Sequence, residues 1–143
     1  MLLWLPSILY MVAIFIVSSI SDVGPMPGGV SDKSMHMLSY AVLGVLLLVP
    51  LARGVLEGVN WPRAIAAIAL ATLYGLSDEF HQSFVPGRSS DIIDVLADGI
   101  GATSGVALVG LLAAARAWGI LKSSSHPAKV GHSRGTFERD SSS

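Results

Sequence analysis

Residues 91–118 read DIIDVLADGIGATSGVALVGLLAAARAW, and the fold class follows from this stretch. From Val95 to Trp118 it runs for 24 residues with charges only at Asp98 and Arg116. A helix of this length crosses about 30 Å of hydrocarbon. Gly101 and Gly105 lie four residues apart within it, and this small-residue pattern lets two membrane helices approach closely. The stretch therefore predicts a membrane-spanning helix with a tightly packed neighbour.

Three earlier stretches have the same character. They are Leu2–Ile20, Met35–Ala52 and Trp61–Ser77, with His36 and Arg63 as their only ionisable side chains. The whole chain of 143 residues is 52% hydrophobic and 13% charged, against about 25% charged in a typical soluble protein. We therefore predict an all-α polytopic membrane bundle of four transmembrane helices over residues 1–118. Leu2–Ile20 also resembles a signal peptide, but it has no preceding Lys or Arg and is longer than usual, which favours a retained span.

The composition excludes several classes of function. A net charge of −1 leaves no general basic surface for nucleic acid. The chain has no cysteine, which excludes disulfides, thiol catalysis and cysteine-based metal centres. Residues 119–143 are rich in Ser and have no apolar period, which predicts a disordered cytoplasmic tail.

The distribution of Lys and Arg predicts the orientation. Four spans place the loops at 21–34 and 78–94 on one side of the membrane, where the only basic side chains are Lys33 and Arg88. The other side holds Arg53, Arg63, Arg116, Lys122, Lys129, Arg134 and Arg139. Because the more basic side is cytoplasmic, we expect a multi-pass protein of the cytoplasmic (inner) membrane with both termini in the cytoplasm.

Acidic side chains gather at the opposite, extracytoplasmic end. Five of the ten lie between Asp78 and Asp98, and Asp32 adds a sixth. Polar groups at membrane depth are costly and usually face a bundle interior or a wet cavity. Asp32 lies one helical turn before His36, so both share a face, and Ser31 is placed to cap their helix. This clustering predicts a site.

The end of the third helix and the following turn add further candidates. Glu79 and Gln82 lie three residues apart on one helix face. Pro86-Gly87 predicts a type II turn, which would hold Arg88 above the mouth of the bundle. Asp94 and Asp98 then follow on one stripe of the fourth helix, with Asp98 nearly two turns deep. At that depth Asp98 needs a cationic partner, a bound cation or a shared proton, and we favour a network in which His36 or Arg88 meets the acidic stripe.

These residues together resemble the VanZ-like family. The resemblance rests on Asp32-Lys33-x-x-His36-x-x-x-Tyr40 and on Tyr74-Gly75-x-x-Asp78-Glu79-x-x-Gln82-x-Phe84-x-Pro86-Gly87-Arg88, followed by Asp94-x-x-Ala97-Asp98-x-x-Gly101. It covers roughly residues 2 to 115 and implies a small bacterial membrane protein linked to resistance to the glycopeptide teicoplanin. It does not imply a reaction. Many members carry Asn where this chain has Asp98.

Two classes of function stay open. In the first, the protein acts on cell-envelope or lipid-linked material, with His36, Glu79 and Asp94 as candidate catalytic residues and Asp32, Lys33, Gln82, Arg88 and Asp98 as candidate binding residues. Lys33 and Arg88 would then clamp an anion, such as a pyrophosphate bridged by Mg²⁺. In the second, the protein is not an enzyme, and its polar cluster is a structural network or modulates access of an antibiotic or peptide. The expected partners are the lipid bilayer and a lipid-linked substrate or a glycopeptide. No metal site is assigned, and cofactor and oligomeric state are left open.

Overall fold

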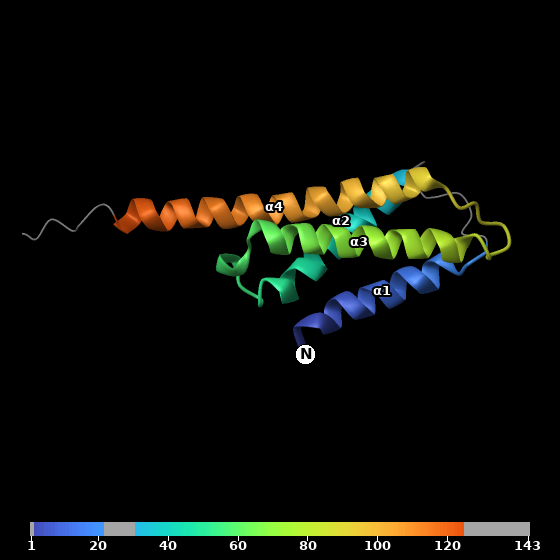
Figure 1. The fold of residues 1–143 in the computed structure, drawn as a ribbon, viewed down its shortest axis with the longest axis horizontal. Helices are drawn as coiled ribbons and strands as arrows, with labels where there is room; N and C mark the ends of the chain where they lie inside the picture. The colour runs from blue at the N-terminus through green and yellow to red at the C-terminus, as the bar shows by residue number, and fades with distance from the viewer. Residues whose placement is uncertain (1, 22–30, 125–143) are drawn as a thin grey trace, which may run out of the picture.

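The computed structural model describes residues 2–21 and 31–124, and every regular element within these ranges is helical. A 3₁₀ turn at Leu2–Trp4 leads into α1 (Leu5–Ser18), and α2 spans Asp32–Leu51. A second 3₁₀ turn at Leu56–Gly58 precedes α3 (Trp61–Gln82), and α4 spans Ile92–Ser124. The predicted all-α class is confirmed, with helices at the four predicted places (Figure 1).

Local sequence signals set the helix boundaries. The Ser31 hydroxyl accepts a hydrogen bond from the Ser34 amide at 3.2 Å, so the predicted cap of α2 is confirmed. The predicted type II turn after α3 is also confirmed, because Gly87 has φ +82° and the Arg88 amide donates to the Val85 carbonyl. Asp91 caps α4 instead of lying within it, since its carboxylate accepts a hydrogen bond from the Ile93 amide at 2.9 Å.

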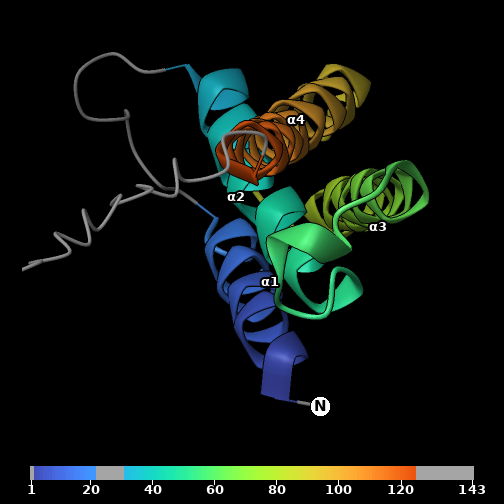
Figure 2. The same ribbon diagram turned by 90° about the vertical axis from the view of Figure 1, so that its left-hand side faces the viewer.

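The central contact of the bundle is between α2 and α4, and Figure 2 shows α1, α3 and α4 arranged around α2. A Cβ at Gly101 would overlap the carbonyl oxygen of Met37, and a Cβ at Gly105 would overlap that of Ala41. From the α2 side, a Cβ at Gly44 would lie 2.9 Å from the Ala102 carbonyl oxygen. Because these glycines have no side chain, the two backbones can touch, as the spacing of Gly101 and Gly105 predicts.

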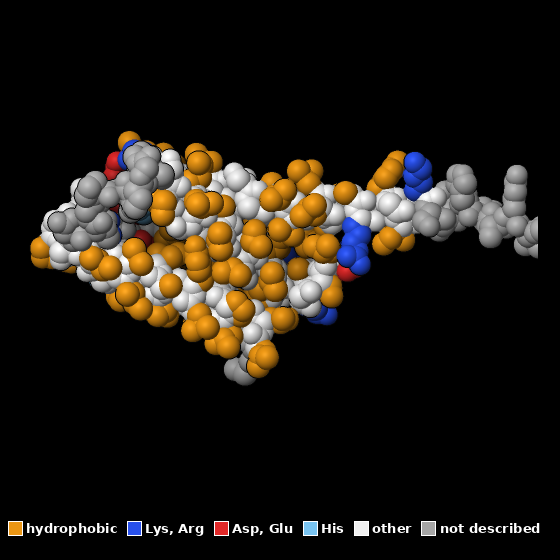
Figure 3. Space-filling view, turned by 180° about the vertical axis from the view of Figure 1, so that it is seen from behind, with side chains coloured by type: hydrophobic (Ala, Val, Ile, Leu, Met, Phe, Trp, Pro, Cys, Tyr) orange, Lys and Arg blue, Asp and Glu red, His pale blue; other side chains and the backbone are white. Residues whose placement is uncertain are grey.

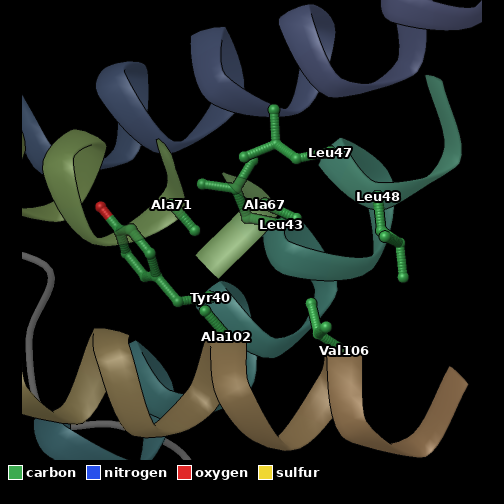
Figure 4. Close-up of a cluster of buried hydrophobic side chains, with 8 residues drawn as sticks. All are labelled: Tyr40, Leu43, Leu47, Leu48, Ala67, Ala71, Ala102 and Val106. Atoms are coloured by element: carbon green, nitrogen blue, oxygen red, sulfur yellow. The ribbon is translucent and has the colours of Figure 1, made fainter. Parts of the chain in front are cut away.

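A hydrophobic cluster fills the space beside this contact (Figure 4). Leu43 and Leu47 of α2 lie next to Ala67 and Ala71 of α3, where the small alanines allow close packing. Tyr40 lies at one end of the cluster, and its hydroxyl is directed away from α4. The full buried set comprises Tyr40, Leu43, Leu47, Leu48, Ala67, Ala71, Ala102 and Val106.

Apolar side chains also cover the outside of the bundle. In Figure 3 they spread along its flank, while charged side chains show mainly at its two ends. Leu38, Leu73 and Leu111 are each more than 60% exposed, an arrangement that suits lipid rather than water. Among the described helices, α2 and the part of α4 from Ile92 to Lys122 are long and apolar enough to cross a membrane, and α1 is a shorter apolar helix.

The fourth helix is longer than expected. The predicted tail begins at Gly119, but α4 continues to Ser124 and runs on past the other helices (Figure 1). The tail boundary is therefore wrong by six residues. Leu and Lys favour helix, and a single Gly costs only about 1 kcal/mol, so Gly119 does not end α4. The rest of the predicted tail, 125–143, lies outside the described residues.

Candidate functional site

The candidate residues meet at one end of the bundle. The end of α1, the start of α2, the end of α3 and the start of α4 all lie there (Figure 1). Seven of the eight candidates from the sequence lie close to one another and form a cluster of acidic, basic and amide side chains. They are Asp32, Lys33, His36, Glu79, Gln82, Asp94 and Asp98. Arg88 is the exception.

His36 lies at the centre of this cluster and links α2 to both neighbouring helices. Its Nδ1 is 3.0 Å from Oδ1 of Asp98, and its Nε2 is 3.9 Å from Oε1 of Glu79. The His36 side chain is 12% exposed, while the Asp98 side chain is completely buried. A carboxylate on one ring nitrogen fixes the orientation of the imidazole and leaves the other nitrogen for a ligand or a proton. The predicted meeting of His36 with the acidic stripe is therefore observed.

Gly75 makes room for the buried carboxylate. A Cβ at this position would overlap Oδ2 of Asp98, so only glycine lets α3 pass so close to α4. The sequence places Gly75 among the residues shared with the family but does not reveal this reason. The atom Oδ2 is buried without a hydrogen-bond partner among the described residues.

Lys33 neutralises the two acids at the beginning of α4, Asp91 at its cap and Asp94 in its first turn. Its ammonium lies 3.0 Å from Asp91 and 3.2 Å from Asp94. Asp94 is buried, whereas Lys33 and Asp91 are partly exposed. The Ile93 amide, and after it the Lys33 ammonium, hold the pKa of Asp91 below its usual range. Lys33 therefore has two carboxylate partners within the protein, which weakens its expected role as an anion clamp.

Asp78 is a further buried acid, which sequence reasoning left out of the site. Its carboxylate accepts hydrogen bonds from the Ser18 hydroxyl at 2.6 Å and from the Gln82 amide at 2.9 Å. The sequence gives no signal for Ser18, because its partner lies 60 positions away. Beside them, Glu79 accepts a hydrogen bond from the Asp91 amide at 2.9 Å. This second cluster therefore ties α1 and the start of α4 to α3.

Arg88 does not pair with the acids, so of the two partners expected for the acidic stripe only His36 meets it, although Arg88 lines the same cavity as Asp32 and Asp78. Its guanidinium donates to the carbonyl oxygens of Val17 and Ile20, each at 3.1 Å. The last carbonyls of a helix lack partners within the helix, and arginine commonly satisfies them. The predicted turn positions Arg88 over the end of α1 instead of over the carboxylates.

A cavity of about 260 Å³ opens beside His36. α1 contributes an apolar wall that includes Ile14, and the charged or amide side chains of the lining are Asp32, His36, Asp78, Gln82 and Arg88. Tyr40 also lines this cavity, and its hydroxyl is buried without a hydrogen-bond partner among the described residues. The cavity therefore offers both polar and apolar walls to one ligand.

Three of the candidate residues have a geometry that a metal ion accepts. Asp32, His36 and Asp94 each offer one ligand atom, and these atoms lie within 4.8 Å of one another. Imidazole with carboxylates is a donor set that Zn²⁺ takes in proteins. However, the Lys33 ammonium already contacts Asp94, so a positive charge lies beside this group, and we assign no metal to it.

The chain matches the model of a known protein family. The model of the VanZ/LLP1 family matches residues 3–113, which include every residue of the site described above. No curated protein and no solved structure matches the chain.

Proposed function

We propose, from the premise that this chain belongs to the VanZ/LLP1 family, that it takes up an amphipathic, lipid-linked component of the cell envelope at the extracytoplasmic face of the membrane. The observation that carries the proposal is the cavity beside His36. One part of its wall is apolar and comes from α1, while another part carries carboxylates, an amide and an imidazole. Sites with a mainly apolar lining and a few convergent polar groups are typical of ligand binding.

The same residues provide for proton transfer. His36 is the candidate base or acid, because Asp98 holds Nδ1 and leaves Nε2 on the side of Glu79. The distance of 3.9 Å between Nε2 and Glu79 is too long for a direct hydrogen bond. A substrate hydroxyl or a water molecule that contacts Nε2 would therefore also lie near the Glu79 carboxylate. Asp94 would support this group from α4.

A structural role for the cluster is the second candidate. It is favoured by the number of acids whose partners already lie within the protein, such as Asp78 with Ser18 and Asp94 with Lys33. In this alternative, the network only joins the helix ends, and the surface modulates access of an antibiotic or a peptide.

Replacement of His36 by Gln distinguishes the two functions. We propose that the full chain protects a susceptible bacterium against teicoplanin. We expect His36→Gln to remove most of this protection, with the protein still present in the membrane at normal abundance. Gln retains a polar side chain but lacks a group that accepts and releases a proton near neutral pH. The measurement is the inhibitory concentration of teicoplanin beside the abundance of the membrane protein.

His81→Gln is the matched control for this experiment. His81 lies at the same end of α3 but contacts Ser19 and the Phe15 ring outside the cluster, so its replacement should leave protection intact. Full protection by His36→Gln would contradict the proposed role of His36. A loss of protein abundance in His36→Gln alone would favour the structural network.

We further propose that all four helices span the membrane, with both termini in the cytoplasm. The proposal is supported by the apolar exterior and by the concentration of Lys and Arg at one end of the chain's helices. The chain has no cysteine of its own, so single cysteines report their position without background. We expect Ser125→Cys to react with an impermeant maleimide only after the cells are opened.

A cysteine at the other end supplies the control. Ser89 follows the Pro86-Gly87 turn and is exposed, so Ser89→Cys should react in intact cells. Labelling of Ser125→Cys in intact cells would overturn the proposed orientation. If the cysteines at positions 89 and 125 were both labelled from the same side, the number of membrane spans between them would be even. That result would contradict a single crossing by α4.

A further inference from the structure

We infer that the cavity beside His36 selects an amphiphile with a positively charged, ammonium-type head group. The inference rests on the proposed uptake of an amphipathic molecule and adds the charge of its head group. It contradicts the expectation that Lys33 and Arg88 clamp an anion, and its first support is the balance of charge around the cavity.

Carboxylates outnumber cations at this end of the described chain. Apart from the exposed pair of Asp91 with Lys33, the acids are Asp32, Asp78, Glu79, Asp94 and Asp98, against Arg88 and the imidazole of His36. Even a protonated His36 leaves the acids in excess. Since like charges repel and opposite charges attract strongly in a partly buried site, the local charge favours a cationic head group over a phosphate.

The two permanent cations are also committed to partners of the protein. The Lys33 ammonium contacts Asp91 and Asp94, and the Arg88 guanidinium donates to two carbonyls of α1. Arg88 lines the cavity together with Asp32 and Asp78, so a phosphate there would meet this guanidinium and two carboxylates. Among the permanent charges of the lining the carboxylates are therefore in the majority, and an ammonium draws neither cation away from its partners.

The hydroxyl of Tyr40 provides an independent observation that points to a ligand. Tyr40 is 1% exposed and lines the cavity, and its hydroxyl has no hydrogen-bond partner within the described residues. Buried polar groups in proteins are usually hydrogen-bonded, so an exception calls for an explanation. An N–H group of a ligand in the cavity would donate to this oxygen and satisfy it.

The apolar wall accounts for the rest of the ligand. Tyr10, Ala13 and Ile14 of α1 and Met35 of α2 line the cavity. Ala13 and Ile14 lie three and four residues after Tyr10, so both fall on the same side of α1 as Tyr10. An alkyl chain laid along this side of α1 leaves water while its head group stays near the acidic end.

Binding of matched single-chain amphiphiles to the purified full chain tests the inference. In a non-ionic detergent, we expect dodecylamine to bind at least about tenfold more tightly than dodecyl phosphate or dodecanol, a ratio typical of one added charge-assisted contact. Ethylamine, which lacks the chain, should bind far more weakly. Dihexanoyl phosphatidylethanolamine tests where the ammonium group comes from. If it binds as well as dodecylamine does, the ligand is a bilayer lipid with an ammonium head group. If dodecylamine alone binds, the ligand is a free amine.

Two variants locate the binding. Asp32→Asn and Tyr40→Phe should each lower the affinity for dodecylamine severalfold, with smaller changes for dodecanol. Asp91→Asn is the matched control, because it removes the same charge at the same end but Asp91 does not line the cavity, and Asn also caps helices well. The affinity of Asp91→Asn for dodecylamine should stay within about twofold of that of the unchanged chain, since the Asp91 carboxylate is already paired with Lys33.

The outcomes separate this inference from the proposed function. Tighter binding of dodecyl phosphate that still depends on Tyr40 would overturn the cationic head group and leave the uptake of an amphiphile standing. Equal binding of all three amphiphiles, unaffected by either variant, would overturn both. Equal losses in Asp91→Asn and Asp32→Asn would show a general charge effect and would also overturn the assigned head-group site.

Discussion

Gly101→Ala is expected to destabilise the bundle by about 1–3 kcal/mol or more, the cost of overpacking a close contact. Alanine is otherwise the better helix former by up to about 1 kcal/mol, so propensity alone predicts the opposite sign. The added Cβ would overlap the Met37 carbonyl oxygen, and this backbone atom moves only if α2 moves away from α4. Thermal unfolding in detergent and abundance in the membrane would measure the loss.

Gly110→Ala on the same helix is the matched control. No atom lies within 4 Å of a Cβ at Gly110, so this replacement should leave the unfolding temperature unchanged or raise it. If Gly101→Ala were as stable as Gly110→Ala, the close contact of α2 with α4 would be wrong. The site would then also lose its basis, because this contact brings His36 to Asp98.

Asp98→Ala should lower the free energy of unfolding by about 3–5 kcal/mol, the range found when one partner of a buried pair is removed. His36 would then keep its place in α2 without the acceptor for its Nδ1–H. We expect protection against teicoplanin to be lost as well, because the ring would no longer be held toward Glu79. Unfolding in detergent and the inhibitory concentration measure the two effects separately.

Asp98→Asn keeps an oxygen that accepts a hydrogen bond from His36, and it fills the space beside Gly75 with a side chain of similar size. We expect normal folding and largely retained function for this variant. Equal losses in Asp98→Asn and Asp98→Ala would show that the negative charge itself is needed. The interpretation of Asp98 as a hydrogen-bonding partner of His36 would then be wrong.

The sequence predicts well what depends on spacing within one helix. The cap at Ser31, the turn at Pro86-Gly87 and the small face at Gly101 and Gly105 all follow from local rules, and each is observed. In an apolar helix, glycines on one face let another helix approach closely, so the close packing of α4 can be predicted from its sequence.

Pairing between helices is less predictable, because it depends on how each helix is rotated. Local spacing places Asp32 one turn before His36, whereas the hydrogen bond of His36 goes to Asp98 on the acidic stripe, 62 positions away. Arg88 was expected among the acids because the charges attract, but the end of α1 offers it carbonyls without helical partners. Ser18 and Gly75 have roles only in the assembled bundle, so no local pattern identifies them.

The polar ties of α1 have a mechanical consequence. Within the described ranges, hydrogen bonds join Met11, Ser18 and Ser19 to side chains of α3, and Arg88 joins the end of α1 to the turn after α3. The hydrogen bonds described for α1 lead to none of the residues of α2 or α4. Therefore hydrogen bonds hold α1 on its α3 side, while its packing against α2, which is at least as extensive, includes none among the described residues. Because lipid tails are as apolar as the side chains they would replace, we expect α1 to separate from α2 at a lower cost than from α3.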